Sequence, residues 1–137
     1  MWEPARHVPL SLLTWNAGEV SAAIEDIAAD ALAHFDDERF WPAHPLEDGL
    51  PDGTTSFYMG ATGVIWALDY LRRVGASKPA FDFTPVLPRL IEKNRAEFAG
   101  QGYAAHGSLL FGDLGTALAA MRLRGEPALA DTIYARA

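Results

Sequence analysis

The 137-residue sequence contains no cysteine, which excludes disulfide bonds, thiol redox chemistry and thiolate metal ligands within this chain. It has no run of the roughly 20 apolar residues that a membrane-spanning helix needs, and residues 1–9 lack the apolar core of a signal peptide. Basic residues are few, with 11 Lys and Arg against 18 Asp and Glu, a net charge of −7 and no basic stripe. Nucleic-acid affinity comes mainly from neutralising phosphates. The sequence therefore predicts a cytoplasmic protein that binds neither membrane nor nucleic acid.

Strand patterns are also missing, because no segment alternates apolar and polar residues between hairpin turns. We therefore expect an all-α fold. Half of the residues are hydrophobic, which excludes a disordered chain, and the length predicts one domain. Residues 39–55 contain five Pro and Gly residues and cannot be helical throughout. Phe40 and Trp41 favour packing of this loop across a surface.

One segment occurs twice, 52 positions apart. Residues 56–63 read Ser-Phe-Tyr-Met-Gly-Ala-Thr-Gly, residues 108–115 read Ser-Leu-Leu-Phe-Gly-Asp-Leu-Gly, and an apolar run follows each. Five of 16 aligned positions are identical, and both glycines keep their spacing. A repeat of this length is typical of stacked helical hairpins, none of which can bury its apolar face alone.

The apolar runs after the two copies, residues 64–71 and 116–123, place apolar side chains on nearly every face of a helix. Helices of this kind are buried on all sides. We therefore expect both in an inner layer, with outer helices covering them, in the chain order outer, inner, outer, inner, outer.

The first outer helix is predicted over residues 20–35, where apolar residues recur at spacings of three and four and acidic residues take the opposite face. Asn16 or Ser21 could cap its start, since either side chain can accept a bond from a free backbone N–H.

The second outer helix is predicted to begin at Thr84-Pro85, a capping hydroxyl followed by proline at the first helical position, and to end near Phe98 before Gly100. A third is predicted to open at Pro127. The expected apolar face of the second comprises Val86, Leu87, Leu90, Ile91 and Phe98.

A Gly-x-x-Gly segment that follows bulky or hydroxyl residues and opens an apolar inner helix resembles the lanthionine synthetase C-like (LanC-like) proteins. Residues 56–64 look like the family's opening inner helix, and residues 40–45, Phe-Trp-Pro-Ala-His-Pro, look like the segment before it in bacterial members. Residues 111–115, Phe-Gly-Asp-Leu-Gly, are similar to the Gly-Asp-x-Gly variant of free-standing members, including the eukaryotic glutathione-binding ones.

The resemblance implies an α/α toroid, a ring of seven inner and seven outer helices. Residues 1–137 would be its N-terminal third, a truncated part of a single domain with the first two or so helical hairpins. It also implies addition of a cysteine thiol to a dehydroamino acid of a peptide at a zinc ion, held by two cysteines and one histidine of the C-terminal part. Zinc lowers the thiol pKa, so that the nucleophile is a bound thiolate. A peptide or a glutathione-like thiol is the partner implied for the full-length protein.

None of these zinc ligands has a matching position in this chain, and the family's acid-base aspartate precedes a later Gly-x-x-Gly segment. We therefore assign no catalytic residue and no cofactor to this chain, which alone is predicted to be inactive. The chain is then either an N-terminal fragment of a longer protein, which we favour, or a degenerate relative that never had the zinc site. Zinc is expected only in a full-length family member.

The four motif glycines, Gly60, Gly63, Gly112 and Gly115, do match the family pattern. Glycine lets backbones approach closely, and a Cβ where inner-helix starts converge would collide with the neighbouring element. The same first turns could point free N–H groups at an anion. Tight packing alone is the simpler interpretation.

The histidines offer two cavity candidates. His44 and His106 lie in loops that lead toward inner-helix starts, so either could donate a proton in a central cavity near neutral pH. The alternative is a surface histidine bonded within its own loop. No pair among His7, His34, His44 and His106 has the close spacing of a known zinc site, so no metal site is predicted.

Asp113 lies at a helix N-terminus, where the helix dipole favours its charge whatever the function; a catalytic or ligand-contacting role is the alternative. Tyr58 and Trp66 fall in the buried pattern and are predicted as core aromatics, with a substrate platform as the alternative. Met59 and Met121 are predicted as packing residues.

Two other functions stay open. A glycoside hydrolase or epimerase on another α/α toroid would use carboxylates. Its candidates would be Asp48, Asp52 and Asp113. A non-catalytic helical interaction module would present a surface to a partner, and an apolar edge beside Leu118, Leu123 and Leu129 would favour self-association.

Overall fold

The computed structural model describes residues 14–42, 53–78, 81–99 and 108–125. Within them the chain forms helices α1 (Ala17–Ala33), α2 (Ala61–Arg73), α3 (Leu87–Ala99) and α4 (Asp113–Arg124), with the short 3₁₀ turn η2 (Thr84–Val86) before α3. The described residues contain no strand, only an isolated bridge between Asp36 and Phe40. The all-α prediction is confirmed for this part of the chain. The third outer helix expected at Pro127 lies outside it.

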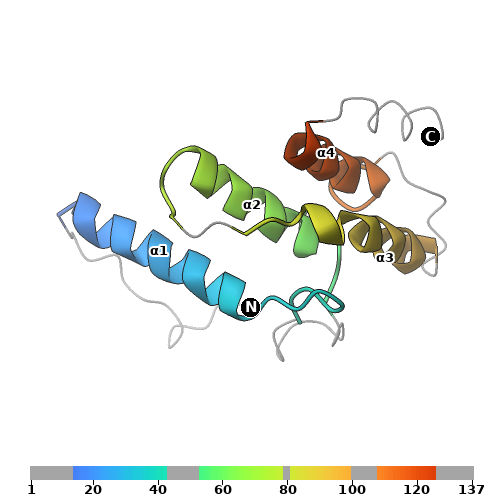
Figure 1. Cartoon of the computed structure of the whole chain (residues 1–137), viewed down its shortest axis with the longest axis horizontal. Helices are drawn as coiled ribbons and strands as arrows, with labels where there is room; N and C mark the ends of the chain where they lie inside the picture. Colours follow the sequence, from blue (N-terminus) through green and yellow to red (C-terminus); the bar gives the residue numbers. More distant parts are fainter. Residues whose placement is uncertain (1–13, 43–52, 79–80, 100–107, 126–137) are drawn as a thin grey trace, which may run out of the picture.

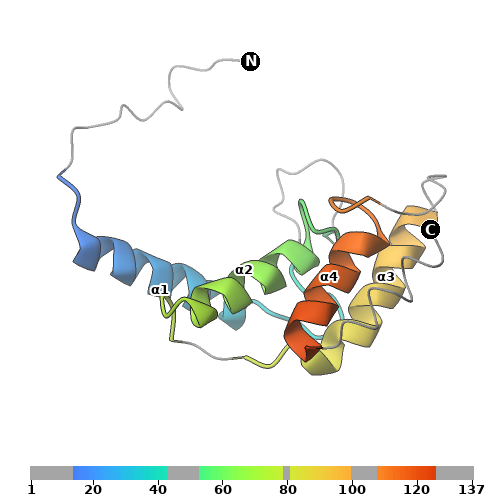
Figure 2. The same cartoon turned by 90° about the horizontal axis from the view of Figure 1, so that it is seen from above.

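Three of the helices form one group, and the fourth extends from it. Helix α4 contacts both α2 and α3 (Figure 1). Helix α1 extends away from the group, with its N-terminal end farthest out (Figure 2). The two helices predicted as inner, α2 and α4, therefore lie side by side, and α3 covers α4.

The core lies where the α2–α3–α4 group meets the turn at residues 36–40. Its buried side chains are Phe40, Ala61, Ile65, Phe83, Leu87, Leu90 and Ala120. Phe40 has a φ of 65°, which is strained for a bulky residue and is held by reciprocal backbone hydrogen bonds with Asp36 at 3.0 and 2.7 Å. Trp41 packs partly against this core and donates its Nε1–H to the Ala31 carbonyl at 2.7 Å. The expected packing of Phe40 and Trp41 is confirmed.

Helix α1 begins three residues before the predicted range, after Asn16, one of the two predicted caps. The Asn16 side chain accepts the Gly18 and Glu19 N–H groups at 3.0 and 3.3 Å, whereas Ser21 lies inside the helix. Its apolar face is less covered than an outer helix requires, because Ala28 alone is buried and Ile27 is 66% exposed. The sequence predicted the helix correctly but not how little of it is covered.

Helix α3 begins at Leu87, two residues after the predicted first helical position, Pro85. Thr84 and Pro85 lie in the 3₁₀ turn instead, and the Asp82 Oδ1 accepts the Thr84 N–H at 2.9 Å. Hydrogen bonds from the Thr84 hydroxyl and backbone hold the pKa of Asp82 below its usual value. The predicted apolar face is correct at Leu87, Leu90 and Phe98, which are buried.

The two helices predicted as inner differ in burial. Helix α4 is buried on most sides, as expected, with Gly115, Thr116, Ala117, Ala119 and Ala120 all inaccessible. Helix α2 is not, since Ala67 is exposed and Tyr70 is 50% exposed. The prediction that α2 is buried on all sides is therefore wrong for the described residues, because α4 covers only one side of this helix.

Candidate functional site

The two Gly-x-x-Gly segments open their helices in the same way. Helix α2 begins at Ala61 and α4 at Asp113, which are equivalent positions of the 52-residue repeat. Each is preceded by an N-cap glycine in extended conformation, Gly60 with φ −133° and ψ −164° and Gly112 with φ −103° and ψ −169°. The sequence repeat is therefore also a repeat of local backbone structure.

Matching hydrogen bonds tighten both turns. In the first copy the Ser56 Oγ accepts the Met59 N–H at 3.1 Å, and the Ser56 carbonyl accepts the Gly60 N–H at 3.1 Å. The second copy repeats both bonds around Ser108, at 3.2 and 3.0 Å. Serine at this position is thus a turn-forming residue in each copy.

The motif glycines leave no room for a Cβ. At Gly63 and Gly115 an added Cβ would lie 2.3 and 2.2 Å from the carbonyl oxygen six residues earlier, and at Gly60 it would lie 2.1 Å from the Thr54 oxygen. At Gly115 it would also lie 2.7 Å from the Phe57 Cβ of the first copy. The predicted collision with a neighbouring element is confirmed at Gly115. At all three positions the nearest obstacle is the preceding turn of the same copy.

The free N–H groups predicted at the start of α2 already have partners. The Ala61 and Thr62 N–H groups donate to the Thr54 and Thr55 carbonyls at 2.9 and 3.3 Å, and the Gly63 N–H donates to the Gly60 carbonyl at 3.0 Å. The prediction that the first turn of α2 could bind an anion is therefore wrong, because carbonyl groups of the preceding residues already accept hydrogen bonds from these N–H groups.

Asp113 occupies the first turn of α4, as predicted, and pairs with an arginine of α3. Its Oδ2 accepts the Nε–H of Arg95 at 2.9 Å, which joins the start of α4 to α3. The helix dipole and the guanidinium both favour the carboxylate here. The geometry assigns Asp113 a structural role.

A polar clamp, formed by Glu97 of α3 with Thr54 and Thr55, fixes the loop before the first motif. One Glu97 carboxylate oxygen accepts the Thr54 hydroxyl, and the other accepts the Thr55 N–H at 2.8 Å and the Thr55 hydroxyl at 2.6 Å. A carboxylate that accepts three bonds ties the loop firmly to α3. Sequence analysis missed it, because 42 residues separate Thr55 from Glu97.

Buried hydroxyl and amide groups extend the clamp toward α4. Asn94 is fully buried and donates its Nδ2–H to the Thr55 hydroxyl at 3.1 Å. The Thr62 hydroxyl donates to the Thr55 carbonyl at 2.6 Å and lies 3.3 Å from the Thr116 hydroxyl of α4. The sequence did contain a sign that Asn94 is buried, since it lies four residues after Leu90 and therefore on the apolar face of α3.

Loss of the clamp is expected to destabilise the protein measurably. Glu97→Ala removes three hydrogen bonds to a charged acceptor, and we expect the free energy of unfolding to fall by about 2–3 kcal/mol in urea titrations. Glu92→Ala, on the exposed face of the same helix, is the control and should change stability by less than about 0.5 kcal/mol. Equal effects of the two substitutions would contradict the clamp.

Several predicted core residues at the motif tips are exposed. Tyr58 is 64% and Met59 58% exposed, so their assignment to the core is wrong. The Tyr58 N–H donates to the Leu110 carbonyl of the second copy at 3.0 Å, and the Tyr58 and Phe111 rings meet edge to face at 5.7 Å between centroids. The two tips thus pack against each other and leave their outer sides open. Met121 is half-buried, in keeping with a packing role.

Most of the other predicted site residues cannot be placed. His44, His106, Asp48, Asp52 and His7 lie outside the described residues. His34 is exposed, with its Nδ1 2.9 Å from the Asp30 carbonyl oxygen. No group of three His, Cys, Asp or Glu side chains in the described ranges is placed to hold a metal ion.

A second polar cluster, which sequence analysis did not anticipate, surrounds Asp69 near the C-terminal end of α2. The Asp69 side chain is 3% exposed and pairs with Arg72, Arg73 and Arg122 at 3.0, 2.7 and 3.0 Å. Burial raises the pKa of Asp69, but the hydrogen bonds from Arg73, Arg72 and Arg122 outweigh it and hold that pKa below its usual value. The Arg122 guanidinium also lies 4.2 Å from the Trp66 ring centroid, so the half-buried Trp66 packs beneath a cation as well as against the Phe57 ring.

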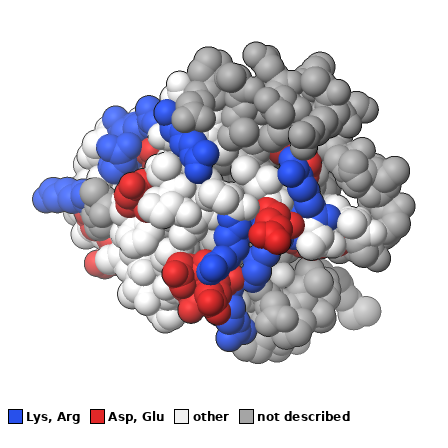
Figure 3. All heavy atoms as spheres, turned by 45° about the vertical axis from the view of Figure 1, so that its right-hand side comes forward, with Lys and Arg blue, Asp and Glu red and all other residues white. Residues whose placement is uncertain are grey.

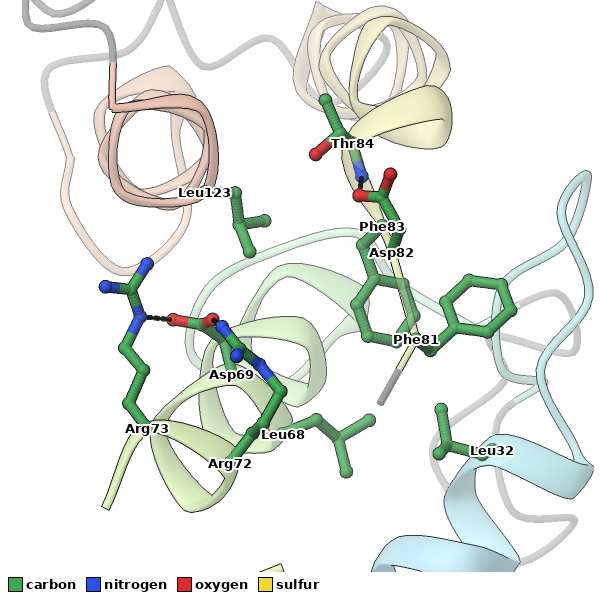
Figure 4. A pocket seen from close by; sticks show the side chains of 10 residues that line it. All are labelled: Leu32, Leu68, Asp69, Arg72, Arg73, Phe81, Asp82, Phe83, Thr84 and Leu123. Carbon is green, nitrogen blue, oxygen red and sulfur yellow. Dashed lines mark hydrogen bonds and ion pairs between the residues drawn. The ribbon is translucent and has the colours of Figure 1, made fainter. Parts of the chain in front are cut away.

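This cluster forms one wall of a cavity of about 390 Å³. Arg72, Arg73 and Asp69 lie on one side, Asp82 and Thr84 lie opposite, and leucine and phenylalanine side chains line the space between them (Figure 4). On the face shown in Figure 3, acidic and basic side chains lie beside one another, without a basic stripe. The cavity is therefore the candidate binding site that the described residues form.

Comparison with known protein families, curated proteins and solved structures finds no match to this chain. None of the helices within the described ranges has the length and apolar character needed to cross a membrane.

Proposed function

We propose that this chain is the N-terminal scaffold portion of a LanC-like protein. Its full-length form would resemble the zinc-dependent enzymes that add a thiol to a dehydroamino acid of a peptide, or the members that bind glutathione. The observation that carries the proposal is the equivalence of the two Gly-x-x-Gly turns, which share the Ser56 and Ser108 hydrogen bonds and exclude a Cβ in the same way.

The arrangement of the helices supports a toroid built by repetition. Helices α2 and α4 begin at equivalent positions, lie side by side and are joined at their starts by the contact of Gly115 with Phe57. Helix α3 lies between them in sequence and packs against α4. Further hairpins added in this manner would close a ring and give the exposed side of α2 a neighbour.

The residues of this chain do not fit the zinc site that the family resemblance implies. Thiolate ligands are excluded by the lack of cysteine, and the described residues form no cluster of other ligands. The contribution we assign to this chain is structural: the clamp at Glu97 and the glycine turns hold the inner helices in register. Catalytic and peptide-binding groups would belong to the remainder of the protein.

The test is biochemical and uses the natural gene product at full length. We expect about one zinc ion per chain by elemental analysis, and either adducts of a cysteine or glutathione thiol on a dehydroalanine peptide by mass spectrometry or saturable binding of glutathione. Residues 1–137 alone serve as the control and should show neither zinc nor adduct. A full-length protein that binds no zinc, forms no adduct and does not bind glutathione would contradict the proposal.

A non-catalytic interaction module is the second candidate, and one observation favours it. The paired motif tips expose Tyr58, Met59, Leu109, Leu110 and Phe111 together, and apolar groups gathered in this way often mark a binding surface. The edge expected beside Leu118 and Leu123 is less open, since both side chains are half-buried, and Leu129 lies outside the described residues. No observation of the described residues favours the carbohydrate-active alternative, because Asp113 is paired with Arg95.

A further inference from the structure

The cavity beside Asp69 has features that the scaffold role does not use. It lies between the C-terminal ends of α2 and α4, at the opposite end of these helices from the Gly-x-x-Gly turns. Its volume of about 390 Å³ is at the lower end of the roughly 300–1,000 Å³ typical of small-molecule pockets. The space is therefore large enough for a small organic ligand.

Two arginines of the cavity wall share one carboxylate with a third arginine that does not line the cavity. Arg72 and Arg73 line it together with Asp69, which also pairs with Arg122 outside the lining, and Asp82 lies opposite. With Arg122 included, three guanidinium groups lie against two carboxylates, an excess of one positive charge. Arg72 donates one N–H to Asp69 and its side chain is 46% exposed, which leaves further donors of its planar fork for a ligand.

The remaining walls are apolar. Leu68 of α2, Leu123 of α4 and the rings of Phe81 and Phe83 line the space next to the arginines (Figure 4). Phe81 is 46% exposed, so an apolar ligand group placed against it would remove hydrophobic surface from water. An occupant thus needs an apolar body in addition to an anionic group.

The charge balance favours a single negative charge on that group. The C-terminal ends of α2 and α4 carry partial negative charge, and Asp82 adds a full one, so a dianion such as a phosphate monoester would be repelled more strongly. A carboxylate matches the guanidinium fork in geometry and carries one charge. We infer that the cavity between Arg72, Leu123 and Phe81 is a binding site for a small carboxylate with an apolar chain or ring. The inference does not depend on the proposed function.

The test is a titration of the full chain with hexanoate, followed by the backbone amide resonances of Phe83, Thr84 and Arg72 in ¹⁵N-resolved NMR spectra. We expect saturable shifts with a dissociation constant on the order of 1 mM, as befits so small a ligand. Hexanol, which lacks the carboxylate, and acetate, which lacks the apolar chain, should each bind at least about tenfold more weakly than hexanoate. Shifts that are absent, or equal for hexanoate and hexanol, would overturn the inference.

Three variants sharpen the result. Arg72→Gln should weaken hexanoate binding about tenfold, while Asp69 keeps Arg73 and Arg122 and the fold persists. Arg89→Gln, an equally exposed arginine of α3, is the matched control and should leave binding unchanged. Asp82→Asn retains a capping side chain, removes the facing charge and should strengthen binding about threefold. Equal effects of the two arginine variants, or weaker binding to Asp82→Asn, would overturn the inference.

Discussion

Replacement of Gly115 by alanine is expected to destabilise the protein by about 3 kcal/mol or more, because the added methyl group has no room between the two copies of the motif. The new Cβ would lie 2.2 Å from the Leu109 carbonyl oxygen and 2.7 Å from the Phe57 Cβ. Neither obstacle is the end of a flexible side chain, so the backbone of one copy must shift against the other. Urea unfolding followed by far-ultraviolet circular dichroism measures the decrease in the free energy of unfolding. Gly63→Ala should lower this free energy by a comparable amount.

Gly75→Ala is the matched control for these substitutions. Gly75 has a φ of 71°, and nothing lies within 4 Å of an added Cβ, so alanine there brings only the strain of a left-handed backbone, about 1 kcal/mol. The difference between the variants isolates the collision from the general cost of replacing glycine. If Gly115→Ala were no more harmful than Gly75→Ala, close approach of the two copies would not explain the motif.

Asp69→Asn is expected to lower the free energy of unfolding by roughly 3 kcal/mol at neutral pH. The substitution leaves three arginines without the carboxylate that joins the last turn of α2 to Arg122 of α4. Asp26→Asn, on the exposed side of α1, is the control and should change stability by less than about 0.5 kcal/mol. Chemical unfolding of both variants beside the wild type provides the measurement.

The effect of Asp69 should depend on pH in a defined direction. Its pKa in the folded protein lies below the ordinary value of 3.8, so its stabilising contribution is complete above that value and is lost as the pH falls through the folded pKa. The stability difference between wild type and Asp69→Asn should therefore shrink below about pH 4. A difference that stays constant down to pH 2 would show that the charge of Asp69 does not stabilise the fold.

Features governed by local chemistry could be predicted from the sequence. The cap at Asn16 and the helix starts after Gly60 and Gly112 depend on a few neighbouring residues, and the structure has them where they were expected. The start of α3 was misplaced by two residues, because a 3₁₀ turn, in which the Leu87 N–H donates to the Thr84 carbonyl, precedes the α-helix. Such turns are frequent at helix N-termini, and the Thr-Pro pattern does not distinguish them from a first α-helical turn.

Features governed by distant contacts could not be predicted. The clamp joins Glu97 to Thr55 across 42 residues, and the Asp69 cluster joins α2 to Arg122 across 53. An apolar pattern also does not reveal whether a neighbour is present to cover it. That is why Tyr58 and Tyr70, both within apolar stretches, are at least half exposed.

We propose that these paired helical turns belong to a larger LanC-like ring. The coding sequence that follows the codon for Ala137 in the source genome tests this proposal most directly. We expect an open frame with further Gly-x-x-Gly segments at helix starts, followed by a cysteine and a Cys-His pair that could hold zinc. A frame that continues without these residues, or a stop codon at that point, would contradict it.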